Sequence, residues 1–145
     1  YKELSQKLGL TTLDKSTDSL SLRLWTSTMF GHRLSLLRKN KEIWESHNYE
    51  YHDSSNLKEI KLRPKISILN LLDSLKKFNF KTLISQNKIE NFRDDVDDGA
   101  TYTLEICYNR QYHIFQYHSP ESFAQNEANN KIFFRIVKIL DEYFR

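Results

Sequence analysis

The acidic run Asp94-Asp95-Val96-Asp97-Asp98 holds the densest group of oxygen ligands in the sequence. Calcium-binding loops have oxygen ligands at their first, third and twelfth positions. Glu105 stands at the twelfth position counted from Asp94, but the third is Val96, and a strand pattern rather than a helix follows. We therefore expect a solvated turn here, and neither a metal ion nor a cofactor.

The histidines are spaced against metal binding as well. His47 and His52 are five residues apart, and so are His113 and His118. Side chains that are an odd number of positions apart on a strand point to opposite faces. We expect neither pair to bind one ion.

Nucleophilic catalysis needs a hydroxyl or thiol beside a base. Cys107 and His113 are close in the chain but fall on opposite faces of a predicted hairpin, so the thiol cannot pass its proton to that imidazole. The sequence has no G-x-S-x-G or H-E-x-x-H motif, and its three glycines form no phosphate-binding loop. We expect a protein that is not an enzyme.

Two alternatives remain open at this point. The predicted hairpin carries four side chains suited to acid-base chemistry, namely Glu105, His113, Tyr117 and His118. A pocket over residues 100–118 would make the chain a small-ligand-binding or hydrolytic domain. A structural protein of the bacterial envelope is the other alternative, which depends on whether a signal or lipid-anchor segment is encoded before Tyr1.

Nucleic-acid binding finds little support in the charge. The net charge is only +3, and the acidic run would repel phosphate. Aromatic strands could stack bases, and one basic cluster precedes a predicted helix, formed by Lys58, Lys61, Arg63 and Lys65. The ribonucleoprotein signature is absent from the strands. We expect no nucleic-acid partner.

A protein-binding surface is the stronger expectation. In the last predicted helix Phe134 lies outside the apolar stripe, on the side shared with Lys138. An aromatic ring with charges around it is typical of protein interfaces. The predicted surface combines this pair with Asp94, Asp95, Asp97 and Asp98. The alternative is that the N-terminal arm or the connection over residues 79–92 covers Phe134.

The stretch from Asp97 to Pro120 must position most of these groups. Alternation on both sides of a short turn at Asn109-Arg110 predicts two paired strands. Pairing about that turn sets Tyr102 opposite Tyr117, Leu104 opposite Phe115 and Ile106 opposite His113. One face is then apolar and aromatic, and the other is mixed.

The remaining elements complete an α+β sandwich. The patterns predict three strands, over residues 20–29, 33–38 and 43–52, and then a loop over residues 53–63. Amphipathic helices are predicted over residues 67–78 and 127–144. The order β-β-β-α-β-β-α predicts an antiparallel sheet of about five strands with both helices on one face.

Length and composition favour one domain over residues 1–145, with residues 1–18 forming an arm or a short helix. The single Cys107 excludes an intramolecular disulfide. No apolar run reaches the roughly 20 residues that a membrane span needs. A start at Tyr1 suits a leader that has been removed, and we expect the bacterial periplasm or cell envelope rather than the cytoplasm.

Four segments together resemble a family of small, uncharacterised bacterial proteins: residues 24–30 (LWTSTMF), 72–77 (LDSLKK), 98–105 (DGATYTLE) and 112–121 (YHIFQYHSPE). Those proteins have the same order of a Trp-containing strand, a Leu-rich helix, a D-G-x-x-Y-x-x-E strand and a Tyr-rich return strand ending in Pro. The resemblance implies this fold and a bacterial source. It implies no activity, cofactor or catalytic residue.

Small bacterial sheet proteins with charged, aromatic surfaces also resemble, in architecture, the immunity proteins that neutralise secreted toxins. The sequence thus predicts a non-catalytic protein-binding domain that covers the active site of a cognate toxin. The acidic run would meet a basic cleft, and Phe134 would anchor the contact. The oligomeric state stays open.

Overall fold

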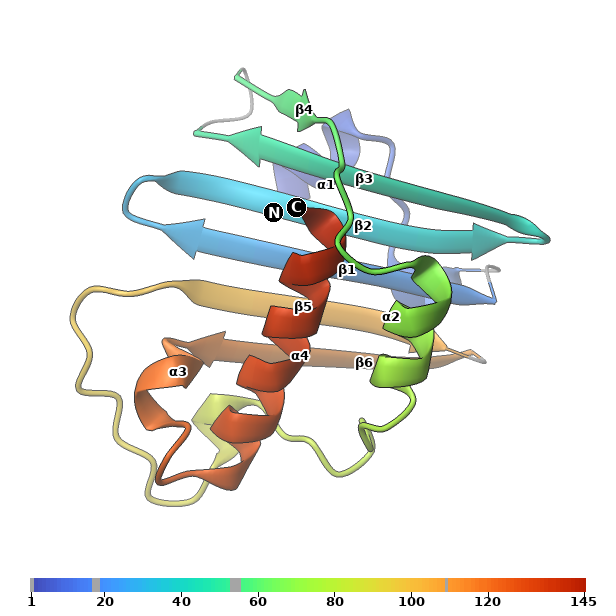
Figure 1. The fold of residues 1–145 in the computed structure, drawn as a ribbon. Helices are drawn as coiled ribbons and strands as arrows, with labels where there is room; N and C mark the ends of the chain where they lie inside the picture. The colour runs from blue at the N-terminus through green and yellow to red at the C-terminus, as the bar shows by residue number, and fades with distance from the viewer. Residues whose placement is uncertain (1, 17–18, 53–55, 109) are drawn as a thin grey trace.

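A single antiparallel sheet organises the computed structural model, which describes residues 2–16, 19–52, 56–108 and 110–145. Within these ranges the sheet has six strands in the order β4-β3-β2-β1-β5-β6 (Figure 1). The strands are β1 (Leu20–Thr28), β2 (Gly31–Asn40), β3 (Ile43–Tyr51), β4 (Lys58–Ile60), β5 (Thr101–Tyr108) and β6 (Gln111–His118).

The central strand β1 is covered on both faces. Its first seven residues are buried, which a strand with one wet face would not show. Leu22 and Leu24 point to one face, and Trp25 points to the other. Two separate apolar clusters therefore meet at this strand.

The larger cluster lies between the sheet and two helices, α2 (Ile68–Leu75) and α4 (Ala128–Phe144). Both cross the same face of the sheet (Figure 1). Ser67 caps α2, since its side chain accepts from the Asn70 backbone N–H, and Glu127 caps α4. The apolar stripe of α4 is buried against the strands, with Phe133 stacked on Tyr117 at a centroid distance of 4.0 Å.

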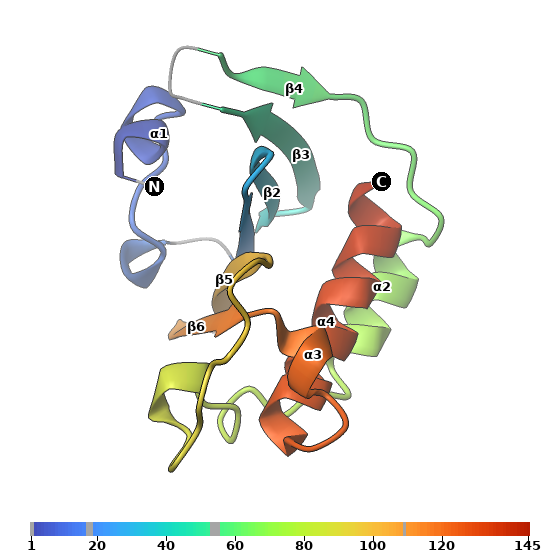
Figure 2. The ribbon, with the colours of Figure 1, turned by 90° about the vertical axis from the view of Figure 1, so that its left-hand side faces the viewer.

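The smaller cluster lies on the opposite face, beneath the N-terminal segment. The helix α1 (Lys2–Lys7) places Leu4 against Trp25 and Leu34. A 3₁₀ turn at Leu13–Lys15 follows (Figure 2). The expected arm over residues 1–18 is thus a covering layer, of which residues 1, 17 and 18 lie outside the described residues.

The C-terminal end of α4 is tied to the sheet by a buried amide. Ser35 Oγ donates to Asn48 Oδ1 at 3.1 Å, and Asn48 Nδ2 donates to the Phe144 carbonyl oxygen at 2.8 Å. The Tyr143 and Ser46 hydroxyls form a further hydrogen bond of 2.8 Å. These bonds hold the C-terminal end of α4 against β2 and β3.

The α+β class with an antiparallel sheet is confirmed, and the finer count needs correction. The expected loop over residues 53–63 contains β4, which pairs with Asn48–Glu50 of β3 and adds a sixth strand. Four α-helices occur in the described ranges instead of two, because a short α3 (Pro120–Phe123) precedes α4 and α1 forms where an arm or a short helix was expected. Three or four residues are too few to show a period.

The hairpin pairing is confirmed. Tyr102 lies opposite Tyr117, Leu104 opposite Phe115 and Ile106 opposite His113. Asn109, which was expected in the turn, lies outside the described residues. Among the described helices, none combines the length and the apolar character that crossing a bilayer requires.

Candidate functional site

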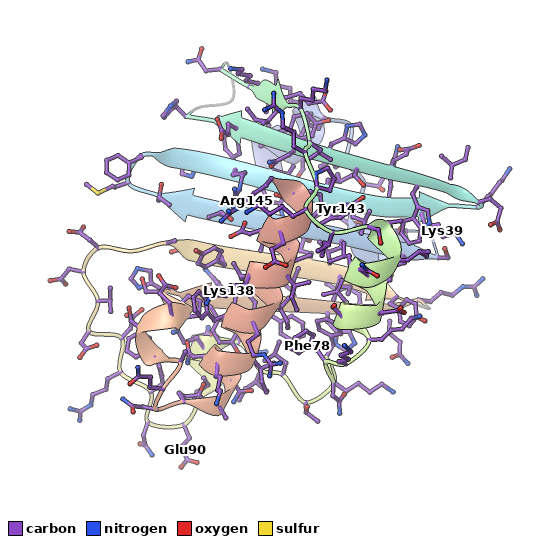
Figure 3. All side chains as sticks on the ribbon, in the orientation of Figure 1. Lys39, Phe78, Glu90, Lys138, Tyr143 and Arg145 are labelled. Atoms are coloured by element: carbon purple, nitrogen blue, oxygen red, sulfur yellow. The ribbon has the colours of Figure 1, made fainter. Side chains whose placement is uncertain are left out.

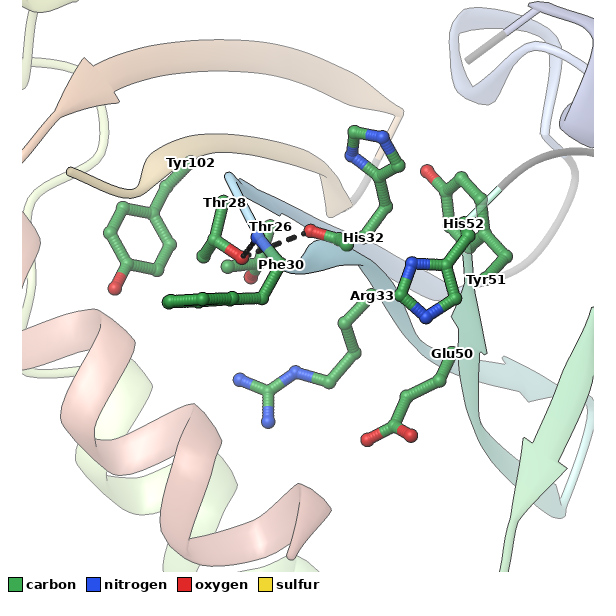
Figure 4. A pocket seen from close by; sticks show the side chains of 10 residues that line it. Thr26, Thr28, Phe30, His32, Arg33, Glu50, Tyr51, His52 and Tyr102 are labelled. Carbon is green, nitrogen blue, oxygen red and sulfur yellow. Dashed lines mark hydrogen bonds between the residues drawn. The ribbon is translucent and has the colours of Figure 1, made fainter. Parts of the chain in front are cut away.

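Two large apolar side chains stand in solvent at the turn between β1 and β2. Met29 is 75% exposed and Phe30 is 80% exposed. Neither side chain stabilises the turn, which is held by the Thr28 hydroxyl. Thr28 Oγ1 donates to the Gly31 carbonyl at 3.1 Å and accepts from the Phe30 N–H at 3.2 Å (Figure 4). Gly31 has φ 141, which favours glycine there. We call Met29 and Phe30 the hairpin tip.

A cavity of about 460 Å³ lies beside the hairpin tip. Four strands contribute to its wall: β1, β2 and β3 are consecutive in the chain, and β5 is distant from them in the sequence (Figure 4). The side chains that matter below are Thr26, Phe30, Arg33, Glu50, His52 and Tyr102. We call this hollow the tip cavity.

The tip cavity carries both signs of charge. Arg33 Nη2 donates to Asp141 Oδ1 of α4 at 2.6 Å, and both side chains are partly buried. Glu50 lies opposite Arg33 in the β2–β3 register, is exposed and makes no hydrogen bond or ion pair within the described residues. The guanidinium and this carboxylate are turned toward the same opening (Figure 4). The hollow can therefore receive a polar or charged group.

Two hydroxyls add hydrogen-bonding capacity to the wall. Thr26 Oγ1 is buried and has no hydrogen-bond partner among the residues that the structure describes. Burial, followed by the carboxylates of Glu121 and Asp141, raises the pKa of Tyr102. The Tyr102 phenol is therefore neutral at physiological pH and is available as a donor.

One side of α4 is bonded to the wall of the tip cavity through Asp141 and Arg33. Phe134, Lys138 and Asp141 share that side because they are four and three residues apart. The Lys138 Nζ lies 4.5 Å from the centre of the Phe134 ring, and Asp141 holds Arg33. Lys138 lies on the side of α4 nearer to the β1–β2 turn (Figure 3). The two predicted residues of α4 thus lie on the side of the helix that bonds Arg33.

Phe134 is half-buried rather than fully exposed. The described part of the N-terminal arm lies on the opposite face of the sheet and does not cover it (Figure 2). The connection over residues 79–92 bonds β6, where its Ile84 carbonyl accepts from the Tyr117 hydroxyl, and also α4, where Gln86 Nε2 donates to Asn130 Oδ1 at 2.8 Å. The Lys138 ammonium lies over this ring.

The four aspartates of the acidic run are exposed between η2 (Gln86–Lys88) and β5. Asp94 Oδ2 lies 2.8 Å from His118 Nδ1, which ties the run to the end of β6. The helix α3 lies between this segment and α4 in both views (Figures 1 and 2). The structure therefore places the acidic run and Phe134 on two sides of α3.

The four side chains of the alternative hairpin pocket are divided between the two faces of the sheet. Tyr117 and His113 lie on the helix-covered face, where the first stacks on Phe133 and the second on Phe115. Burial, followed by the Glu127 carboxylate, raises the pKa of Tyr117 far above its usual range. Tyr117 and His113 therefore pack against aromatic residues of the core.

Glu105 and His118 lie on the opposite face. Glu105 accepts from Trp25 Nε1 at 2.7 Å and from the Tyr112 hydroxyl at 3.1 Å. Its carboxylate is thus used to hold two aromatic side chains. The structure does not bring these two residues together with Tyr117 and His113.

One pair that the sequence reasoning missed combines a nucleophile with a base. Ser27 Oγ lies 2.7 Å from His32 Nδ1, because the two residues are cross-strand partners. The His32 ring stacks on Tyr51, and no carboxylate bonds it in the described ranges. His32 is also one of the residues that line the tip cavity (Figure 4). Across residues 2–16, 19–52, 56–108 and 110–145, no group of three potential metal ligands occurs.

The hairpin tip was also missed. Met29 was expected to end the first strand, with a turn at Gly31-His32, whereas β1 ends at Thr28, the turn is at Met29-Phe30 and Gly31 begins β2. Thr28 two residues before Phe30 was the available signal for a side-chain-stabilised turn.

Comparisons with protein-family models, with curated proteins and with solved structures give no match for this chain. The functional argument is therefore built on the residues and the geometry described above.

Proposed function

We propose that this chain is a non-catalytic protein-binding domain of the immunity type, which binds and neutralises a secreted toxin. The observation that carries the proposal is the hairpin tip, where Met29 and Phe30 are held in solvent by the fold. Isolated exposed apolar residues are common, but two adjacent ones beside a polar hollow form the pattern of an interface.

The hairpin tip offers enough energy to anchor a complex. Complete burial of a Met or Phe side chain is worth about 1.5–3 kcal/mol. The surrounding residues Arg33 and Tyr102 belong to types enriched among binding hot spots. The tip cavity would receive a side chain of the partner, with Arg33 and Glu50 supplying charge on its wall.

The acidic run has a separate role in this proposal. Four exposed aspartates create a negative potential that would speed the approach of a basic toxin cleft. Such steering acts on the association rate and weakens with salt, whereas the hairpin tip acts on the lifetime of the complex.

The test is capture with three tagged versions of the chain. The tip variant combines Met29→Ser with Phe30→Ser. The matched control is Ile43→Ser, since Ile43 is 66% exposed at the opposite end of the sheet (Figure 1). We expect a stoichiometric partner that wild type and control retain and the tip variant loses, with Kd raised by about a hundredfold or more.

Neutralisation is tested by expressing the captured partner in a sensitive cell. We expect the partner alone to stop growth, wild type to restore it, and the tip variant to fail at equal abundance. A partner that all three versions bind equally would refute the assigned surface. A captured protein without toxicity would refute the immunity role.

The acidic run has its own variant, in which lysine replaces Asp94, Asp95, Asp97 and Asp98. We expect this variant to associate more slowly at low salt and to dissociate at the wild-type rate. An unchanged association rate would mean that the acidic run is not part of the binding surface. It would not affect the assignment of the hairpin tip.

A further inference from the structure

A second hollow lies at the other end of the sheet, beneath α2. Its volume is about 470 Å³, and its lining is mainly apolar. Leu20, Leu75 and Ile106 form the buried floor, while Trp44 and Phe80 stand at the sides. We call it the α2 groove. It shares no lining residue with the tip cavity.

The groove lies where α2 meets the ends of the central strands. Leu72 and Leu75 of α2 line it together with Leu20 of β1 and Ile106 of β5. Concave apolar sites of this size with a few polar groups are the usual form of small-molecule sites.

Two cations stand at the groove and no anion does. Lys39 and Lys76 are among its lining residues, and none of the lining residues is acidic. Lys39 Nζ lies 5.6 Å from the centre of the Trp44 ring, which keeps the ammonium at the edge of the apolar surface. Lys39 lies on β2, which is the neighbour of β1 in the sheet. It is at the end of the sheet opposite to the side where Lys138 lies (Figure 3).

The carboxylates nearest to these lysines hold them weakly. Lys39 Nζ is 3.8 Å from Glu42, whose side chain is 95% exposed. Lys76 Nζ is 3.3 Å from Asp73, and both of those side chains are mostly exposed. Such surface pairs contribute little and exchange readily. Both ammonium groups are thus available to an anion seated at the groove.

We propose that the α2 groove binds a single-chain fatty acid, with the alkyl chain on the apolar floor and the carboxylate between Lys39 and Lys76. The apolar floor selects a chain, and the charge at the groove selects an anion over a neutral or cationic head group. This site is separate from the proposed toxin-binding surface, and neither proposal depends on the other.

The experiment titrates the full chain with decanoic acid, decanol and decyltrimethylammonium by calorimetry, below their aggregation concentrations. We expect decanoic acid to bind at least tenfold more tightly than decanol, and the ammonium compound more weakly than both. In the series octanoic, decanoic, dodecanoic acid, each step of two methylenes should tighten binding roughly tenfold. Trp44 lines the groove, so its fluorescence should change when the fatty acid binds, and Trp44→Phe should remove that change.

The decisive variant combines Lys39→Glu with Lys76→Glu, and its control combines Lys41→Glu with Lys77→Glu. Both change the net charge equally at surface positions, but Lys41 and Lys77 do not line the groove. We expect the first variant to lose at least tenfold in affinity for decanoic acid with decanol binding unchanged. The control should match wild type.

Three results would overturn the proposal. They are equal binding of decanoic acid and decanol by wild type, equal losses in the two charge variants, and no binding of any chain length. A fourth measurement guards against a general apolar effect: Leu72 is a half-buried residue of the groove lining, and Leu72→Trp fills the groove from α2. Undiminished fatty-acid binding by this folded variant would also refute the proposal.

Discussion

Replacing Asn48 by alanine should weaken the fold more than any exposed asparagine could. This side chain is 4% exposed and lies between the sheet and the end of α4. It accepts from Ser35 Oγ and donates to the Phe144 carbonyl oxygen. Asn48→Ala removes both hydrogen bonds and leaves both partner groups buried.

The size of the loss follows from these groups. Two intramolecular hydrogen bonds contribute about 2 kcal/mol together, and the groups left without partners add about 1 kcal/mol. We therefore expect the free energy of unfolding to fall by about 3 kcal/mol. For a chain of this length, that fall corresponds to a Tm lower by roughly 9 °C.

Urea denaturation followed by tryptophan fluorescence measures this loss, with the slope m unchanged from wild type. Asn126→Ala is the control, because Asn126 is exposed in the loop before α4. That control should stay within about 0.5 kcal/mol of wild type. Ser35→Ala completes a double-mutant cycle, in which we expect a coupling of about 1 kcal/mol with Asn48→Ala.

A loss below about 1 kcal/mol in Asn48→Ala, with two-state unfolding intact, would refute the reasoning. It would mean that the amide does not hold the end of α4. A coupling near zero in the cycle would refute the Ser35 bond alone and leave the Phe144 bond to account for the loss.

Two further predictions concern pH. Burial, followed by the Glu105 carboxylate, raises the pKa of Tyr112 to about 12. The free energy of unfolding should therefore be unaffected by this group below the unfolded-state pKa of about 10, and should fall as pH rises from there toward 12. Tyr112→Phe should show a smaller fall over this range when denaturation is measured at a series of pH values. Burial alone would raise the pKa of Glu127, but hydrogen bonds from the Asn130 backbone and side chain outweigh it and lower the pKa. Its contribution is present at neutral pH and lost as pH falls through the lowered folded value, so Glu127→Gln should lose less stability than wild type in an acid titration followed by circular dichroism.

Local sequence patterns predicted the elements whose residues are near one another in the chain, namely helices and hairpins. The pairing of Tyr102 with Tyr117 follows from alternation on both sides of a short turn, and the structure has that register. The helix predicted over residues 127–144 forms as Ala128–Phe144, because its apolar stripe repeats over more than four turns. The strand β4 was missed, since three residues carry no period.

The candidate sites were less accessible to such reasoning. The tip cavity joins Thr26, Arg33, Glu50 and Tyr102 from four strands, and no short pattern indicates that β5 lies beside β1. The α2 groove likewise joins residues of α2 to residues of β1, β2 and β5. A sequence pattern shows which side chains share a face, but the distance between two faces is set by packing.

The sequence by itself determined the α+β class, the hairpin register and the helical stripe, because hydrogen bonding between near neighbours and the spacing of apolar residues decide them. Only the tertiary structure decided which strands far apart in the chain adjoin, that the N-terminal segment buries Trp25, and that Met29 and Phe30 stay in solvent. The physical reason is that long-range pairing depends on the fit of whole surfaces, which no local window of residues contains.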